Sequence, residues 1–535
     1  MAGEPSSELF KQMQHPDFYP HPAGTVEIRE THISKVFLAG EFVYKIKKPL
    51  NLEFLDFASL ENRKYFCRQE VALNRRLTEN VYLGVIPITF DGRAYHLEWE
   101  GDAVEYAVKM RRLPDNCTMA RLLETDEIHP QEISGLANVL EKFYDRPVDK
   151  DEADRFGTWE VISANCDENF AQTARFAGKL FDADVFSIVR AAMKAFLRRR
   201  KPLFDKRAIS GKIQDCHGDL RADHIYFVDD GIQIIDCVEF NPALRYGDVA
   251  SDLAFLAMDL DCRGRADTAN HLLTEYVRRT GDADLFVLVD FYKCYRAMVR
   301  FKVNCIRAME EDVTRPEKER LRFEIEKYLH LAVDYAIRFT RPVLWIICGL
   351  PASGKSTIAG KLGEAFQIPV FRSDMIRKQN FASPDADFSH LAFEDGIYAK
   401  GLTALTYGRM LLSAQETIEK GSSVVLDATF GARHYRREAL RLAADMDANI
   451  FFVECTAPEE LRKERLAARK PGSSLSDARL AHFDAFRKSF EPLEEIDSDH
   501  HIIVNTDRSV DECVGRILYD EYIALPRKQS IFGPF

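Results

Sequence analysis

The sequence of 535 residues lacks the features that mark membrane-spanning and secreted proteins. No apolar run approaches the length of a membrane span, and the first residues, MAGEPSSELFKQMQ, contain no apolar core of a signal peptide. The eleven cysteines are scattered and include no Cys-x-x-Cys pair. Because several fall within apolar strand patterns, buried thiols in a reducing compartment explain them better than disulfides or a zinc site. We therefore expect a cytoplasmic protein that does not associate with membranes.

An excess of positive charge is also missing, since the formal net charge is −12. This balance argues against a protein that coats nucleic acid, although a local basic pocket for one phosphorylated or nucleotide substrate is compatible with it. The length predicts two or three domains. The hydrophobic and charged fractions, 46% and 30%, are those of a soluble globular protein, and no short repeat or low-complexity tract is present.

A glycine-rich segment in the second half of the chain has the form of a phosphate-binding loop. An apolar run at 343–348 predicts a buried strand, Gly-x-x-x-x-Gly-Lys-Ser follows, and a helical pattern begins at once. Lys355 is expected to reach the β- and γ-phosphates of ATP, and the Ser356 hydroxyl to hold Mg²⁺. A chance glycine-rich turn is the alternative, which the context on both sides disfavours. The predicted nucleotide-binding residues are Gly349, Ser353, Gly354, Lys355, Ser356 and Thr357.

Strand and helix patterns alternate from this loop onward, which predicts a parallel sheet with helices on both faces and sites at the carboxyl ends of its strands. We assign residues 342–525 to this P-loop domain, 336–341 to a linker and 526–535 to a tail. The strand VVLD ends in Asp427, an aspartate positioned to orient Mg²⁺.

Another strand of this domain is followed by Ser373-Asp374-Met-Ile-Arg377, which resembles the small P-loop kinases polynucleotide kinase, zeta toxin and chloramphenicol phosphotransferase. The resemblance implies that Asp374 is a general base and that Arg377 binds an anionic part of the acceptor. A helix N-cap is the alternative role for Asp374. Arg465 and Arg469 lie on one face of a predicted lid helix and are candidates for stabilising charge on the phosphates, whereas Arg462 fits a solvated face equally well.

The first half begins with a lead-in at 1–29 and continues with short strands, a helix near 60–77 and further strands. A helical region follows, and then Cys216-His217-Gly218-Asp219-Leu220 and the strand end Ile234-Ile235-Asp236. Phosphate transfer to a hydroxyl requires one carboxylate near the acceptor and another for Mg²⁺. Two aspartates at the two ends of a β-hairpin can supply both.

This combination resembles the aminoglycoside phosphotransferase family, which is related to protein kinases, over residues 30–335. The resemblance implies a bilobal kinase-like domain in which Asp219 is the catalytic base and Asp236 the Mg²⁺ ligand. It also implies that Lys45 binds ATP phosphates and that Glu70 is its ion-pair partner. His224 stands where the family carries Asn as a second metal ligand, so the second metal position is in doubt.

Two lysines next to Lys45, namely Lys47 and Lys48, are expected to be solvated. We also expect Asp248 and Asp252 to brace the catalytic loop or to cap a helix rather than to do chemistry.

Taken together, the sequence predicts an α/β and α+β fusion of an aminoglycoside phosphotransferase-like domain with a P-loop kinase domain. The expected function is ATP- and Mg²⁺-dependent transfer of phosphate to a hydroxyl of a small molecule such as a sugar, nucleoside, polyol or aminoglycoside. Two alternatives stay open. One domain is a pseudokinase or nucleotide-sensing switch that regulates the other, or the protein phosphorylates the 5′-hydroxyl of a nucleotide or nucleic acid, which the acidic charge disfavours.

Overall fold

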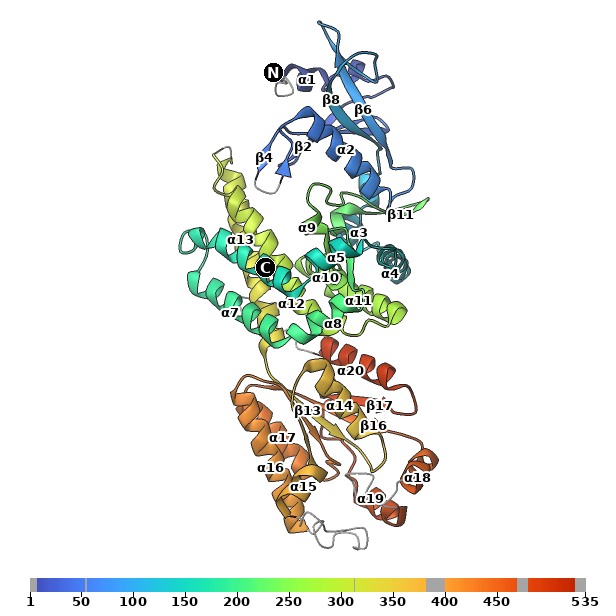
Figure 1. The fold of residues 1–535 in the computed structure, drawn as a ribbon, viewed down its shortest axis with the longest axis vertical. Helices are drawn as coiled ribbons and strands as arrows, with labels where there is room; N and C mark the ends of the chain where they lie inside the picture. Colours follow the sequence, from blue (N-terminus) through green and yellow to red (C-terminus); the bar gives the residue numbers. More distant parts are fainter. Residues whose placement is uncertain (1–6, 53–54, 312, 382–399, 469–479, 525–535) are drawn as a thin grey trace. The chain divides into compact units, whose positions relative to one another are not determined.

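The computed structural model describes residues 7–52, 55–311, 313–381, 400–468 and 480–524 (Figure 1). The chain divides into two compact units. Unit 1 comprises Met1–Ile162 and Lys206–Thr280, and unit 2 comprises Ser163–Asp205 and Gly281–Phe535. The predicted boundary at 336–341 therefore lies within unit 2. A division by spatial contacts does not test sequence domains, and that boundary stays a prediction.

Unit 1 contains an antiparallel sheet in which six strands can be described, in the order β1-β2-β3-β8-β6-β7. Its strands are β1 (Glu27–Glu30), β2 (Ser34–Ala39), β3 (Phe42–Lys47), β6 (Tyr82–Phe90), β7 (Tyr95–Leu97) and β8 (Ala103–Arg111). One face of the sheet packs a core that includes Phe37, Tyr44 and Ile88, and Leu9 and Met13 of the lead-in belong to the same core. The lead-in therefore covers part of this sheet.

Helix α2 (Leu60–Asn74) packs against β6 and β8, and the Ser59 side chain caps it by accepting a hydrogen bond from the Asn62 amide. The other helices of unit 1 are α1 (Ser7–Gln12), α3 (Met119–Thr125), α4 (Pro130–Tyr144), α5 (Lys150–Phe156), α9 (Pro242–Arg245), α10 (Val249–Cys262) and α11 (Ala266–Thr280). The division between the units falls inside α6 (Trp159–Thr173) and α8 (Lys201–Ile209).

Three small antiparallel pairs complete the described part of unit 1. They are β4 (Asn51–Leu52) with β5 (Leu55–Asp56), β9 (Ile213–Asp215) with β12 (Tyr246–Asp248), and β10 (Ile225–Val228) with β11 (Gly231–Ile234). The β10–β11 hairpin turns at Asp229 and Asp230, so the loop that carries Asp219 precedes the predicted hairpin and Asp236 follows it.

Unit 2 contains a parallel sheet whose described strands follow the order β14-β15-β13-β16-β17. They are β13 (Val343–Cys348), β14 (Val370–Arg372), β15 (Val424–Asp427), β16 (Asn449–Thr456) and β17 (His501–Asn505). Alternate side chains of β13 face opposite sides of the sheet. Leu344 and Ile346 join the core beneath α16 (Lys400–Glu419) and α17 (Arg433–Asp445), whereas Trp345 stacks on Phe366 of α14 (Lys355–Phe366).

Helices cover both faces of this sheet, with α16 and α17 on one side and α14 and α20 (Val510–Ala524) on the other (Figure 1). The remaining helices of unit 2 are α7 (Ala183–Arg199), α12 (Leu285–Arg307), α13 (Arg315–Thr340), α15 (Ser373–Phe381), α18 (Glu459–Ala467) and α19 (Phe483–Ser489). Helix α12 packs against α13 and α20, and Lys293 Nζ donates a hydrogen bond of 2.8 Å to the Tyr522 hydroxyl. The predicted mixed fold, with an antiparallel N-terminal sheet and a parallel C-terminal sheet flanked by helices, is confirmed.

Within the described segments, none of the helices combines the length and apolar character needed to cross a membrane.

Candidate active sites

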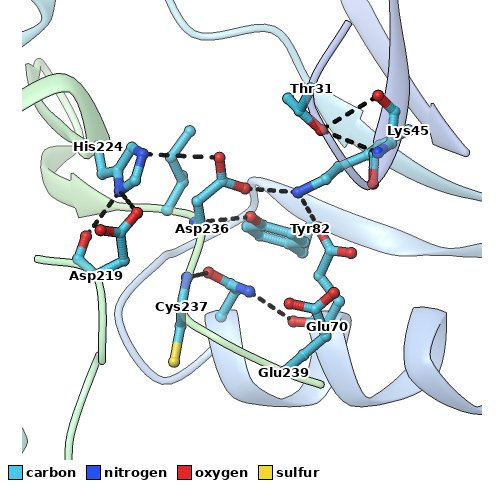
Figure 2. A network of polar contacts seen from close by, with 12 residues as sticks. Thr31, Lys45, Glu70, Tyr82, Asp219, His224, Asp236, Cys237 and Glu239 are labelled. Carbon is cyan, nitrogen blue, oxygen red and sulfur yellow. Dashed lines mark hydrogen bonds and ion pairs between the residues drawn. The ribbon is translucent and has the colours of Figure 1, made fainter. Parts of the chain in front are cut away.

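The kinase-like site of unit 1 brings together Lys45 on β3, Glu70 on α2 and Asp236 after β11 (Figure 2). Lys45 Nζ lies 2.9 Å from Glu70 Oε1 and 2.8 Å from Asp236 Oδ1. Burial disfavours the charged form of Lys45, but the two carboxylates outweigh that effect and raise its pKa. The lysine is therefore a permanent cation beside the predicted metal ligand, as a phosphate-binding group must be.

Lys47 was expected to be solvated, and this prediction is wrong. Its side chain is fully buried, its Nζ lies 2.7 Å from Glu70 Oε2, and it also contacts a carboxylate oxygen of Glu239. The reason is strand geometry. Residues two apart on a strand point to the same face, so the side chain of Lys47, like that of Lys45, points toward α2. Lys48 points the other way, keeps partial exposure and pairs with Glu30 at 2.7 Å.

Asp236 occupies a left-handed backbone position, with φ of 63°, and its amide donates a hydrogen bond of 3.2 Å to the Tyr82 hydroxyl. Left-handed geometry is uncommon outside glycine, and aspartate and asparagine tolerate it best. Desolvation raises the pKa of the Asp236 carboxyl, but Lys45 and His224 more than compensate, so the net shift is downward. The carboxylate is thus held ionised, which is the form that binds a divalent cation.

The predicted base, Asp219, is paired with a residue that the sequence analysis missed. Arg221 Nε lies 3.0 Å from Asp219 Oδ1 and Arg221 Nη2 lies 3.1 Å from Oδ2, a two-pronged ion pair. Asp219 raises the pKa of Arg221 although burial opposes the shift. The sequence signal was available, because a cation two residues after the predicted base is close enough to bind it.

His224, in the short helix η4 (Ala222–His224), lies between the two aspartates. Its Nδ1 lies 2.9 Å from the Asp219 carbonyl oxygen and can only donate to it, which leaves Nε2 as the acceptor. Arg221 Nη2 lies 3.1 Å from this Nε2, and Asp236 Oδ2 lies 4.0 Å from it. The imidazole lone pair is thus directed at Arg221 in this arrangement, and the structure does not show His224 as a second metal ligand.

The loop that carries Asp219 is fixed from behind by buried groups. Asp252 on α10 accepts hydrogen bonds from the amides of His217 and Gly218, at 2.9 and 3.0 Å, and from the Tyr144 hydroxyl. Asp248 caps α10 and forms two contacts of 2.7 Å with Arg207. Both aspartates therefore have the bracing and capping roles that we expected.

The P-loop of unit 2 has the backbone form that the glycines permit. Gly349 and Gly354 have φ of 126° and 85°, and a Cβ on Gly349 would lie 2.4 Å from the Cys455 carbonyl oxygen. Lys355, the first residue of α14, donates a hydrogen bond of 2.8 Å to the Leu350 carbonyl oxygen. Burial lowers the pKa of Lys355, while the nearby Asp427 carboxylate opposes that shift.

The metal side of this site is formed by Ser356 and Asp427. The Ser356 side chain is hydrogen-bonded to Asp427, and burial nevertheless raises the pKa of this carboxyl. A second cation, Arg372 at the end of β14, lies 3.8 Å from Asp427 Oδ2 and donates to the Ser356 carbonyl oxygen at 3.2 Å. The sequence analysis did not select Arg372, although it precedes the Ser373-Asp374 motif directly.

Asp374 and Arg377 are the residues predicted to act on the substrate that accepts the phosphate. They lie side by side at the start of α15, where Arg377 Nη1 is 3.4 Å from Asp374 Oδ1. On the opposite side of the P-loop, Arg465 of α18 donates to the Ala352 carbonyl oxygen at 3.3 Å and to the Thr506 carbonyl oxygen at 2.9 Å. Arg462 instead is buried against the Phe483 ring. Arg469 lies outside the described residues.

No group of three or more histidine, cysteine, aspartate or glutamate side chains converges as a metal site in the part of the chain that the structure describes. Mg²⁺ in nucleotide sites is held by one or two protein oxygens together with phosphates and water. The ionised Asp236 and the Ser356–Asp427 pair fit that kind of donor set.

Comparison with known proteins shows which protein family the chain belongs to. Residues 344–493 match the family model described as AAA domain, so the C-terminal part is a P-loop domain. The chain is 32% identical over 464 residues to "Uncharacterized protein Rv2004c" of Mycobacterium tuberculosis (strain ATCC 25618 / H37Rv), covering 87% of this chain and 90% of that protein. The same values hold for "Uncharacterized protein Mb2027c" of Mycobacterium bovis (strain ATCC BAA-935 / AF2122/97). The chain belongs to the family of these mycobacterial proteins.

Solved structures give weaker likenesses. A choline/ethanolamine kinase family protein from Mesorhizobium loti is 14% identical, covers 58% of this chain and 92% of its own, and has a TM-score of 0.35. The APS kinase of Mycobacterium tuberculosis in complex with AMPPNP and APS is 20% identical, covers 34% of this chain and 97% of its own, and has a TM-score of 0.26. Likenesses at these scores carry no part of the functional argument.

Proposed function

We propose that the protein is an ATP-dependent phosphotransferase with two nucleotide sites, which transfers the γ-phosphate to a hydroxyl group of a small molecule. One observation carries the proposal. In each unit a partly buried lysine is influenced by an aspartate at or just after the end of a strand, since Lys45 Nζ lies 2.8 Å from Asp236 Oδ1 and the Asp427 carboxylate acts on the pKa of Lys355. A cation for phosphate next to a carboxylate for Mg²⁺ is the minimum that phosphoryl transfer requires.

The proposed chemistry is the same at both sites. The acceptor oxygen attacks the γ-phosphorus, the bond between this phosphorus and the oxygen of the ADP leaving group breaks, and the acceptor proton passes to a carboxylate. Asp219 takes this proton at the first site and Asp374 at the second. Mg²⁺, when held by Asp236 or by Ser356 and Asp427, neutralises charge on the phosphates.

The surrounding cations position the reactants of the second site. Arg377 lies beside Asp374 and binds an anionic part of the acceptor, which orients its hydroxyl toward the base. Arg465 and Arg469 act on the phosphates from the lid side. Arg465 is already fixed against the P-loop backbone through Ala352.

A nucleotide-sensing role for the first site is the second candidate, and the Asp219–Arg221 pair favours it. Both carboxylate oxygens of Asp219 are engaged by the guanidinium, which uses one lone pair on each oxygen and leaves fewer acceptor positions for a substrate hydroxyl. Under this alternative, ATP binds through Lys45 and Asp236 without turnover and affects the second site.

The test is ADP release over a panel of sugars, nucleosides, polyols, aminoglycosides and 5′-hydroxyl oligonucleotides. Lys355→Ala is expected to abolish turnover at the second site alone, and Asp219→Asn at the first alone. Lys361→Ala and Asp229→Asn, at exposed neighbouring positions, are the matched controls. Full turnover of every acceptor by Asp219→Asn would favour the nucleotide sensor, whereas ADP release that no acceptor stimulates would refute the transferase.

A further inference from the structure

The expected Lys45–Glu70 ion pair is part of a longer chain of alternating charges in unit 1. Asp236 contacts Lys45, Lys45 contacts Glu70, Glu70 contacts Lys47, and Lys47 contacts Glu239. The five groups come from strand β3, from helix α2 and from the segment after β11. Figure 2 shows four of them, Lys45, Glu70, Asp236 and Glu239. Glu239 lies only three residues beyond Asp236, so the last link returns to the segment that carries the predicted metal ligand.

Glu70 is divided between the two lysines, because Oε1 lies 2.9 Å from Lys45 Nζ and Oε2 lies 2.7 Å from Lys47 Nζ. The side chain of Lys47 has no exposed surface, and the carboxyl side chain of Glu239 is 5% exposed. Neither group can therefore touch a nucleotide in this arrangement. Any influence of Lys47 on phosphate binding must act through Glu70 and the local charge.

The net charge of these five groups indicates how Lys47 influences phosphate binding. Fully ionised, three carboxylates and two lysines give the chain a net charge of −1. Loss of Lys47 alone makes it −2, and loss of Lys47 together with the charge of Glu239 restores −1. Since charges a few ångströms apart in a protein interact strongly, a more negative cluster holds Lys45 more tightly and repels the phosphates.

We propose that Lys47 is a positioning residue of the first nucleotide site, which neutralises Glu70 and Glu239 so that Lys45 is available to the phosphates. The inference rests on the proposed function, because it requires that Lys45 binds a nucleotide. It goes beyond the kinase resemblance, which assigns a single lysine to this strand.

The experiment measures the affinity of full-length protein for the Mg²⁺ complex of a non-hydrolysable ATP analogue by calorimetric titration. All variants carry Lys355→Ala, so that only the first site is read, and the pH is about 8 because burial raises the pKa of Glu239 above that of an ordinary glutamate. Lys47→Met is expected to weaken binding by about 10- to 100-fold, and Lys47→Arg to retain it, because one unit charge near phosphate is worth at least a factor of ten. Lys48→Met, at the partly exposed neighbour, is expected to change nothing.

The decisive variant is the double substitution Lys47→Met with Glu239→Gln. Charge compensation predicts that it binds within about threefold of the parent, whereas Glu239→Gln alone binds as tightly as the parent or more tightly. A purely structural role for Lys47 predicts the reverse, namely that the second substitution adds to the loss. Weaker binding by the double variant than by Lys47→Met overturns the proposal, as does unchanged binding by Lys47→Met.

Two further outcomes are informative. If Lys47→Met fails to fold, Glu239→Gln alone decides, because weaker binding by this variant contradicts the charge argument and equal or tighter binding supports it. If the Lys355→Ala parent binds no analogue and Lys45→Met is indistinguishable from it, the proposed function of the first site fails and the inference falls with it. Binding by the parent with the wrong order of variants overturns the inference alone.

Discussion

The two candidate sites differ in how far apart in the sequence their parts lie. The P-loop site is nearly contiguous, because one loop and the first turn of α14 supply its glycines, lysine and serine. The kinase-like site is assembled from β3, α2 and two loops, so that Lys45 and Asp236 meet although 191 residues separate them. The P-loop site is therefore shaped largely by backbone conformation, and the kinase-like site by side-chain charges that hold one another.

The largest expected effect comes from removing the metal carboxylate at each site. Asp236→Asn and Asp427→Asn are each expected to reduce transfer at their own site by about 10³-fold or more, since Mg²⁺ neutralises the developing charge. ADP release by each variant, in a background with the other site disabled, gives the measurement. Loss at both sites from one substitution would contradict two independent sites.

The same two variants are expected to differ in thermal stability. Asp236→Asn removes one of the two carboxylates that pair with the partly buried Lys45 and is expected to lower the melting temperature, because Glu70 alone compensates this charge less well. Asp427→Asn is expected to cost little, since burial already disfavours the ionised form of this carboxyl. Thermal unfolding of the two proteins at neutral pH distinguishes these outcomes.

The next largest effect is expected from a substitution that disturbs the backbone conformation of the P-loop. Gly349→Ala would place a Cβ 2.4 Å from the Cys455 carbonyl oxygen at a φ of 126°, so the loop or β16 must shift. We expect ATP binding at this site to weaken by about 100-fold, equivalent to a strain of roughly 2–3 kcal/mol.

Two other glycines calibrate this prediction. Gly515→Ala in α20 meets only Ala283 Cβ at 3.6 Å and should leave binding unchanged. Gly218→Ala in the kinase-like loop meets the Leu244 carbonyl oxygen at 2.9 Å, and we expect an intermediate loss confined to the first site. Unimpaired titration of Gly349→Ala with the ATP analogue would show that the loop adjusts freely.

The difference between the sites also explains what the sequence could predict. The P-loop sequence and the parallel sheet with helices on both faces follow from local patterns, and the same patterns single out Asp427 and Asp374 near strand ends. Lys47 was misjudged because a row of lysines in a strand resembles a solvated edge until α2 is known to cover one face. Arg372 was missed because tertiary geometry brings its partners, the Asp427 carboxylate and the Ser356 carbonyl oxygen, close to it, whereas Arg221 lies two residues from Asp219 and could have been selected.

The pKa of a buried glutamate in unit 2, Glu521, is shifted in the opposite direction from that of Asp236 in unit 1. Burial raises the pKa of Glu521 on α20 to about 8, an effect that Arg200 only partly opposes. The folded protein therefore binds a proton that the unfolded chain releases near pH 4.3, so this stabilising contribution is present at low pH and lost as the pH rises through about 8.

The expected result is a melting temperature that falls between about pH 5.5 and pH 8, with a change in unfolding free energy on the order of 2 kcal/mol. Glu521→Gln should flatten this dependence, and Glu416→Gln, an exposed position on α16, should not. The pairs in unit 1 give the contrasting case, because the lowered pKa of Asp236 adds stability that is lost only in acid. A wild-type slope retained by Glu521→Gln would assign the dependence to other groups.

The smallest effect tests whether side chains also contribute to the P-loop site. Arg465→Gln removes hydrogen bonds to the Ala352 carbonyl oxygen and to both oxygens of Thr506, and we expect about a tenfold loss of kcat/KM for ATP at this site. Among the described residues, Arg462→Gln removes a bond to the Ala457 carbonyl oxygen and contact with the Phe483 ring, neither of which belongs to the P-loop, so its effect should be confined to stability. Equal kinetic losses from the two variants would mean that both arginines act through the position of α18. If Arg465→Gln caused no loss, the Arg465 side chain would not contribute to the P-loop site.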